Sequence, residues 1–427
     1  MMQEKIYNQN FTEGQELLHT PGGVRDIYGI ECARKRKVEG DVHDVMKLYG
    51  FHDIETPTFE YFDIFSKERG TVQSGEMFKF FDRGNNTLVL RPDVTPSIAR
   101  CIAKYQKDEE MQIRLCYTGN TFVNTSQYKG KLQEVTQVGA ELYNDETSDA
   151  DAEMIAMMVE CLLKSGLEEF QLEIGHADIF RGLVEEAGFQ KAETEQLRSL
   201  IVSKNFFGVE ALLDKLTISD KLKEIFEKLP DLLGNVSECI GFVKERTGSE
   251  RVLQALDRLL KVEEIVKSYG YSDYITVDLS MLSQYSYYTG VIFRAYTYGN
   301  GEAIASGGRY DGLVSQFGKE APAIGLAIVI DQLMLALTRQ KRFEESILGG
   351  TVLLYPQSLR GKALELAREY REKGKAIQML RKSSKKPYGE YLEYARRMQL
   401  DTILYLKEET ELIVADVASG REECREI

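Results

Sequence analysis

Histidine and cysteine are the side chains that most often bind metal ions or act as nucleophiles, and this chain has four histidines and six cysteines. The cysteines form no CxxC pair, and the histidines show no spacing typical of metal ligands. The residues concerned are His19, His43, His52, His176, Cys32, Cys101, Cys116, Cys161, Cys239 and Cys424. This pattern argues against a zinc hydrolase, a zinc ribbon and a disulfide framework, and it is typical of a reducing cytosol. We therefore predict no metal centre.

A GxG triplet at Gly299 and Gly301 has the composition of a loop that cradles phosphates. It joins two strand-like segments, 291–298 and 302–306, and does not open a helix, so we give it no weight as a dinucleotide-binding loop. The dipeptide Asn300-Gly301 adopts positive φ at little cost, and it predicts a tight hairpin between the two segments.

Basic residues gather between residues 371 and 397, where nine of them accompany three acidic ones. A solvated helix and loop is the interpretation we favour, and an RNA-facing patch stays open as the alternative. The whole chain carries 54 basic and 68 acidic residues, a net charge of −14 that does not suit general binding to nucleic acid or to membrane surfaces. No stretch approaches the roughly 18 apolar residues of a membrane helix, and the N-terminus lacks a signal-peptide pattern. We expect a cytoplasmic protein.

A chain of 427 residues predicts two or three domains. Apolar spacing predicts helices at 31–49 and from Ser148, as the cap, to 166. A charge-rich stretch at about 178–270 predicts an inserted helical piece. Strand patterns occur at 54–56, 79–82, 87–90, 112–117, 134–142, 170–174 and 274–279.

The last part of the chain alternates strand and helix patterns, which predicts a small α/β domain with a largely parallel sheet. The predicted elements are strands at 351–355, 376–380 and 402–406 with helices at 359–373 and 388–399. We therefore divide the chain at residues 1–343 and 344–427.

Five ordered motifs carry more information than these patterns do. They are residues 20–26 (TPGGVRD), 76–80 (EMFKF), 88–96 (LVLRPDVTP), 287–293 (YYTGVIF) and 306–313 (SGGRYDGL). Together they resemble histidyl-tRNA synthetase, a class II aminoacyl-tRNA synthetase, in order from about residue 18 to 335. The resemblance implies an α+β fold with an antiparallel class II sheet and helices. It also implies a dimer formed through the helix and strand near 31–57, and an anticodon-binding-like C-terminal domain.

The same resemblance implies a binding site for L-histidine. Position by position, the residues that match the family's histidine-binding residues are Asp93, Thr95, Gln137, Glu141, Tyr287 and Tyr288. Asp93 matches an acidic residue that faces the substrate ammonium, and it is one methylene shorter than the family's usual Glu. Gln137 and Glu141 are four residues apart on a predicted strand, so both side chains lie on one face.

The nucleotide side departs from the family, whose arginines neutralise the charge of the activated phosphate. The family's Arg after the Phe, its adenine-contacting Glu, its Gly-Arg turn, its catalytic Arg and its ATP-clamping Arg are replaced here by Val123, Thr125, Lys131, Ser283 and Gln332. Loss of one such charge partner typically costs on the order of 10²–10³ in rate, so we predict that adenylation is negligible.

Residues 18–21 (LHTP) and 117–122 (YTGNTF) resemble a non-catalytic branch of the synthetases, the regulatory subunits of ATP phosphoribosyltransferase. That resemblance implies a partner, the short-form catalytic subunit, in a hetero-octamer that carries out the first step of histidine biosynthesis. It also implies that L-histidine acts as the feedback effector, and it requires no cofactor. Two alternatives remain: an active histidyl-tRNA synthetase, and a synthetase-like RNA-binding or sensor protein. Binding of tRNA is not expected.

Overall fold

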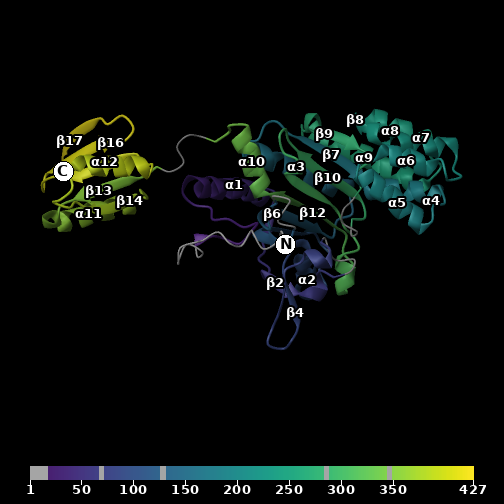
Figure 1. Ribbon diagram of the computed structural model, residues 1–427, viewed down its shortest axis with the longest axis horizontal. Coiled ribbons are helices and arrows are strands. Elements are labelled where there is room, and N and C mark those ends of the chain that lie inside the picture. The colour runs from purple at the N-terminus through teal and green to yellow at the C-terminus, as the bar shows by residue number, and fades with distance from the viewer. Residues whose placement is uncertain (1–17, 67–71, 126–130, 283–287, 344–348) are drawn as a thin grey trace, which may run out of the picture. The chain divides into compact units, whose positions relative to one another are not determined.

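The computed structural model in Figure 1 describes residues 18–66, 72–125, 131–282, 288–343 and 349–427. The chain forms two compact units, which contain residues 35–342 and 343–427 respectively, and each is described by itself. We propose that the chain is organised as two domains, 1–343 and 344–427, as predicted from the sequence. Within the described residues, no helix is both long enough and apolar enough to pass through a membrane.

A nine-stranded sheet forms the centre of the larger unit, with the strand order β1-β5-β6-β12-β11-β10-β7-β9-β8. Its strands are β1 His52–Asp53, β5 Ile113–Phe122, β6 Glu134–Tyr143, β7 Gln171–His176, β8 Leu233–Gly234, β9 Ile275–Asp278, β10 Val291–Tyr296, β11 Ala305–Arg309 and β12 Ala323–Val329. The β1–β5 and β7–β9 pairs are parallel, and the other pairs are antiparallel. The predicted antiparallel class II sheet is therefore confirmed.

Helices cover this sheet on both faces. Alternate residues of β6 explain why: Val138, Ala140 and Leu142 are fully buried on one face, while Tyr143 belongs to a separate core cluster on the other. Helix α2 (Thr95–Tyr105) contributes Ile98 to that second cluster. The other helices that pack on the sheet are α3 (Ser148–Lys164), α9 (Glu250–Ser268) and α10 (Ile330–Arg339).

The segment predicted as a helical insertion is helical in the structure. Its helices are α4 Ala177–Glu186, α5 Lys191–Val202, α6 Phe206–Leu213, α7 Asp220–Lys228, α8 Val236–Lys244 and α9. Helix α1 spans Gly29–Leu48 and matches the helix predicted near the start of the chain. A separate three-stranded sheet joins β2 Phe59–Tyr61, β4 Thr87–Leu90 and β3 Lys79–Phe81.

Three local predictions are wrong. The strand expected at 54–56 lies at 52–53 instead, because only Asp53 and its neighbour pair with β5, while Ile54 adds one further hydrogen bond. The cap of α3 is Thr147, whose side chain accepts from the Ala150 N–H. Strands β10 and β11 do pair, but residues 297–304 form a longer loop: positive φ falls on Gly299, and Asn300 donates to the Gln332 carbonyl.

The smaller unit contains a five-stranded sheet in the order β14-β13-β15-β16-β17. Its elements are β13 Thr351–Tyr355, α11 Arg360–Glu372, β14 Ile377–Arg381, α12 Tyr388–Arg397, β15 Thr402–Leu406, β16 Glu411–Asp416 and β17 Glu422–Glu426. The first three strands are parallel as predicted, but β16 and β17 add antiparallel pairs. The prediction of a largely parallel sheet is wrong for β16 and β17. These strands follow β15 through short connections, and short connections join only antiparallel neighbours. Alternate residues of β13 enter two clusters, one with α12 and one with α11, so the helices lie on opposite faces.

Candidate functional site

Glu141 is a fully buried carboxyl group near the C-terminal end of β6, with 1% of its surface exposed. The Thr95 hydroxyl, at the first residue of α2, donates to its Oε1 at 2.6 Å. The Tyr310 hydroxyl, one residue beyond β11, donates to its Oε2 and lies 3.3 Å from the Tyr143 hydroxyl. Three elements that are distant in the sequence therefore converge on one acidic group.

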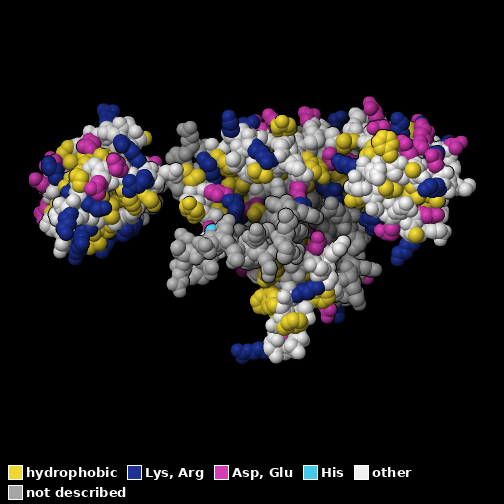
Figure 2. All heavy atoms as spheres, in the orientation of Figure 1, with side chains coloured by type: hydrophobic (Ala, Val, Ile, Leu, Met, Phe, Trp, Pro, Cys, Tyr) yellow, Lys and Arg dark blue, Asp and Glu magenta, His cyan; other side chains and the backbone are white. Residues whose placement is uncertain are grey.

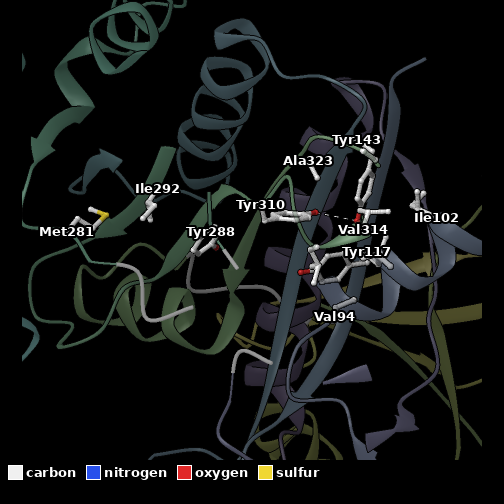
Figure 3. Packing of buried hydrophobic residues seen from close by; sticks show 14 residues of the cluster. Val94, Ile102, Tyr117, Tyr143, Met281, Tyr288, Ile292, Tyr310, Val314 and Ala323 are labelled. Atoms are coloured by element: carbon white, nitrogen blue, oxygen red, sulfur yellow. Dashed lines mark hydrogen bonds between the residues drawn. The ribbon is translucent and has the colours of Figure 1, made fainter. Parts of the chain in front are cut away.

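Four buried tyrosines of one core cluster lie on this side of the sheet: Tyr117, Tyr143, Tyr288 and Tyr310. In Figure 3 the rings of Tyr117, Tyr143 and Tyr310 converge, and Tyr288 lies on the far side of Tyr310. The Tyr143 and Tyr310 rings meet edge to face, with centroids 6.3 Å apart and planes at 80°. This arrangement suits a flat ring with polar edges, because aromatic faces and hydroxyl groups are both present.

Glycines on neighbouring strands make room for these side chains. Gly325 pairs with Glu141 across β12 and β6, and a Cβ at Gly325 would overlap the carboxylate. A Cβ at Gly308 would lie 2.8 Å from the Tyr288 ring, which is closer than real Cβ contacts come. Glycine is therefore required at both positions for the buried side chains to lie flat on the sheet.

Burial raises the pKa of Glu141 to about 8, because the charged form loses its hydration. The hydrogen bonds from Thr95 and Tyr310 act in the opposite direction, and the nearby Asp93 carboxylate raises the pKa further. In the ligand-free chain at neutral pH, Glu141 is therefore mostly protonated. A cationic or hydrogen-bond-donating ligand would favour its ionised form.

Two polar atoms on the Glu141 face of the sheet are buried without a hydrogen-bond partner among the residues that the structure describes: the Gln137 Oε1 and the Tyr117 hydroxyl. Such groups cost free energy unless a partner is supplied. Gln137 lies on the same face of β6 as Glu141. The face therefore offers an amide, a phenol and a carboxyl group to a polar ligand.

The structure brings together most of the residues predicted from the sequence. Asp93 accepts a hydrogen bond from the Thr95 N–H at 3.3 Å, and Tyr288 belongs to the same core cluster as Tyr310. Tyr287 lies outside the described residues. Sequence reasoning did not name Tyr117, Tyr143 and Tyr310 as site residues, although Tyr143 follows Glu141 by two residues on one strand face, a spacing that could have indicated it.

A buried ion cluster holds Tyr310 in place from outside the site. Arg309, only 5% exposed, donates to the Asp151 Oδ1 at 2.6 and 2.8 Å, and Arg258 donates to the Asp151 Oδ2 at 2.7 Å. Asp311 accepts from Arg309 at 3.1 Å and from the Thr289 hydroxyl at 3.2 Å. These bonds fix the residues on either side of Tyr310 and tie them to the segment that carries Tyr288.

The described positions at which nucleotide-side residues of the synthetase pattern are replaced do not gather positive charge. Lys131 forms an ion pair with Glu302, and the Gln332 Nε2 donates to the same carboxylate at 3.4 Å. Val123 and Thr125 both bond to Gln133. The Gln133 carbonyl accepts from the Val123 N–H, and the Gln133 side chain donates to the Thr125 carbonyl. Ser283 lies outside the described residues. A carboxylate thus lies beside two of the positions where a triphosphate would need cations.

Several basic residues of 371–397 form ion pairs or hydrogen bonds within the smaller unit. Lys373 pairs with Glu369 and Lys386 pairs with Glu390, while Arg371 and Arg396 donate to backbone carbonyls. Figure 2 shows Lys and Arg side chains interspersed with acidic and apolar ones on this unit. The structure therefore favours a solvated face over an RNA-facing patch.

Comparisons with known proteins agree with this fold. The sequence matches the histidyl-tRNA synthetase family over residues 23–333. An ATP phosphoribosyltransferase regulatory subunit from Acetivibrio thermocellus is 40% identical over 362 residues, covering 85% of this chain and 86% of that protein. The protein of the same name from Ruminiclostridium cellulolyticum is 37% identical over 403 residues, covering 94% of this chain and 96% of that protein. A solved structure from Bacillus halodurans, described as an ATP phosphoribosyltransferase regulatory subunit/histidyl-tRNA synthetase, has a TM-score of 0.81 and 32% identity. It covers 91% of this chain and 98% of its own.

The nine-stranded sheet and the family match over residues 23–333 define a class II protein of the histidyl-tRNA synthetase type. The chain belongs to the family of ATP phosphoribosyltransferase regulatory subunits. The family predicted from the sequence is therefore confirmed, and the names of the relatives describe a regulatory subunit and not a catalytic one.

Proposed function

We propose that this chain binds L-histidine at the site around Glu141 and regulates a short-form ATP phosphoribosyltransferase catalytic subunit with which it assembles. The observation that carries the proposal is the buried Glu141 carboxyl group, bonded to Thr95 and Tyr310, together with the Gln137 Oε1 and the Tyr117 hydroxyl, which have no hydrogen-bond partner among the described residues. The proposed complex forms phosphoribosyl-ATP, the first step of histidine biosynthesis, and histidine inhibits it.

An imidazole is the side chain that these groups suit best. It has two ring nitrogens at fixed directions, so one can donate to Glu141 while the rest of the ring stacks among the tyrosines. Asp93 is the acidic group proposed to face the α-ammonium of the ligand, and it lies close enough to Glu141 to affect its pKa. The ligand cation would also relieve the repulsion between the two carboxyl groups.

The nucleotide side supports a regulatory role over synthetase chemistry. Activation of an amino acid builds negative charge on phosphate, and preorganised cations must meet it. Lys131 and Gln332 instead contact the Glu302 carboxylate. We therefore propose that histidine is bound and not activated.

Feedback by histidine requires that it bind more tightly to the low-activity arrangement of the complex. A coupling of about 1–3 kcal/mol is sufficient for this, and linkage requires the catalytic subunit to change histidine affinity by the same factor. The self-association through 31–57, the hetero-octamer and the cytoplasmic location belong to this proposal as well, on the strength of the family resemblance.

The direct test is to mix the purified chain with a short-form catalytic subunit and to follow phosphoribosyl-ATP formation. Activity should depend on the chain and should fall when histidine is added. If the two proteins form no complex, and if the chain alone exchanges pyrophosphate into ATP with histidine present, the protein is an active synthetase and the proposal is wrong. Tight binding of tRNA that weakens steeply with salt would favour the RNA-binding alternative.

Glu141→Gln is expected to raise the dissociation constant for histidine about 10- to 100-fold, because a hydrogen bond to a charged group contributes about 1.5–3 kcal/mol. Calorimetric titration of the chain with histidine measures this change. Glu195→Gln is the matched control, since Glu195 is exposed on α5 and far along the chain from the site. Equal affinities for the Glu141 variant and the wild type would remove Glu141 from the proposed site.

A further inference from the structure

Three potential metal ligands meet at the β1–β5 edge of the large sheet, where Cys116 directly precedes Tyr117 on β5 and therefore points to the opposite face from the Glu141 site. His43 comes from α1, Asp53 from β1 and Cys116 from β5. The Cys116 Sγ lies 3.8 Å from the His43 Nε2 and 3.7 Å from the Asp53 Oδ1. The His43 Nε2 and the Asp53 Oδ1 are 2.5 Å apart.

We propose that His43, Asp53 and Cys116 bind a zinc ion, with three protein ligands and one position open to solvent. This proposal goes beyond the regulatory function and does not depend on it. The three residues are a mixed nitrogen, oxygen and sulfur set, which is the chemistry that zinc selects over magnesium or calcium.

The spacing of the ligand atoms is close to what zinc requires. Zinc bonds of about 2.3 Å to sulfur and about 2.0–2.2 Å to nitrogen and oxygen place tetrahedral ligand atoms roughly 3.3–3.6 Å apart. The two sulfur distances, 3.7 and 3.8 Å, are already near this range. Only the His43–Asp53 pair, now joined by a hydrogen bond, must separate, and by less than about 1 Å.

The backbone fixes two of the three ligands. Asp53 and Cys116 are direct register partners in the parallel β1–β5 pair, so their separation is set by the sheet. The Lys47 ammonium holds the Asp53 Oδ2 at 2.8 Å and leaves the Oδ1 directed toward His43 and Cys116. A partner on the second oxygen is how proteins commonly orient a ligating carboxylate.

The exposure of the three side chains and their charges are also compatible with a bound zinc ion. In the single chain the Asp53 side chain is 62% exposed and the His43 side chain 28%, whereas Cys116 is buried, so an ion and a water ligand can enter past the carboxylate. Asp53 and His43 both lie in the segment 31–57 that is proposed for self-association, so this access is that of the chain before it associates. A thiolate and a carboxylate together balance the two positive charges of zinc. A cysteine binds zinc as the thiolate, so the ion must displace the thiol proton of Cys116 as it binds.

The alternative is a hydrogen-bonded His43–Asp53–Lys47 surface cluster above a buried thiol, without affinity for metal. Sequence spacing cannot decide between the two, because the ligands are separated by 10, 63 and 73 positions in the chain. The prediction of no metal centre rested on local spacing, which does not detect ligands that come together only through a helix and two strands.

Cobalt(II) is the probe that tests the site in the full-length, metal-free chain. One cobalt ion per chain should bind with a thiolate-to-metal charge-transfer band in the near ultraviolet, and zinc should displace it. Cys116→Ser should abolish this band. Cys424→Ser is the matched control, because Cys424 is an exposed thiol near the Glu411 carboxylate and represents adventitious binding.

His43→Gln is a second variant, in a partly exposed residue, which keeps the test valid if Cys116→Ser does not fold. It should weaken cobalt and zinc binding at least about tenfold, with an unchanged circular dichroism spectrum. The proposal is overturned if the band is absent in the wild type, if it persists in Cys116→Ser, or if Cys424→Ser removes it. It is also overturned if a folded His43→Gln binds either metal as tightly as the wild type.

Discussion

Glu141→Gln is expected to stabilise the protein relative to the wild type as the pH rises, by up to about 5 kcal/mol at pH 8. The carboxyl group of Glu141 ionises near its ordinary value of 4.5 in the unfolded chain and at about 8 in the folded chain. Between these values the folded state holds a proton that the unfolded state has lost, so the contribution of Glu141 to stability falls by about 1.4 kcal/mol per pH unit. This contribution is fully present below pH 4.5 and is lost as the pH rises to 8. Glutamine resembles the protonated carboxyl group and has no such dependence.

Denaturant unfolding of the two proteins at several pH values between 4.5 and 8 measures this difference. The comparison must be made between variant and wild type, because other groups act on the total. His176, for example, has its pKa lowered to about 4 by burial, so its contribution is lost as the pH falls. Glu195→Gln should follow the wild type throughout. Parallel stability curves for Glu141→Gln and the wild type would show that Glu141 is not buried in its neutral form.

Asp151→Asn is expected to lower the free energy of unfolding by about 3–5 kcal/mol, since removing one partner from a buried ion pair leaves the other charge uncompensated. Asp151 is completely buried, and it accepts bonds from Arg309 and Arg258 on its two oxygens. Arg309 is itself almost fully buried. Because Arg309 directly precedes Tyr310, the loss should also loosen the Tyr310 contact with Glu141.

Asp149→Asn is the matched control for this change, because Asp149 is an exposed residue in the first turn of the same helix, α3. Urea unfolding should separate the two variants, with Asp149→Asn within about 0.5 kcal/mol of the wild type. If both variants have the same stability as the wild type, the Arg309–Asp151–Arg258 cluster does not hold this part of the fold together.

Local patterns in the sequence predicted much of the secondary structure. The segment 134–142 alternates in the way that a half-buried strand requires, and it forms β6 with Gln137 and Glu141 on one face. The apolar period of 31–49 predicted α1 in the same way. Predictions failed where a tertiary contact decided the outcome: Asn300 binds the Gln332 carbonyl and does not close a tight turn.

The residues of the proposed histidine site could be named from ordered motifs, but the side chains that surround them could not. Asp93, Thr95, Glu141 and Tyr288 could be named from motif positions alone. That Tyr310 donates to Glu141, and that Gly325 leaves room for the carboxylate, depends on strand register between β6 and β12. Register is a long-range property, because it follows from which strands pair and not from the residues next to Glu141.

The sequence by itself determined the family, the class II fold and the replacement of the synthetase arginines, because each is written in residue identities at ordered positions. Only the tertiary structure decided that Glu141 is buried and has a raised pKa, that Asp151 forms ion pairs with two arginines, and that His43, Asp53 and Cys116 meet. The physical reason is that burial, ion pairing and metal coordination depend on distances between atoms, and folding brings together side chains that are many positions apart in the chain.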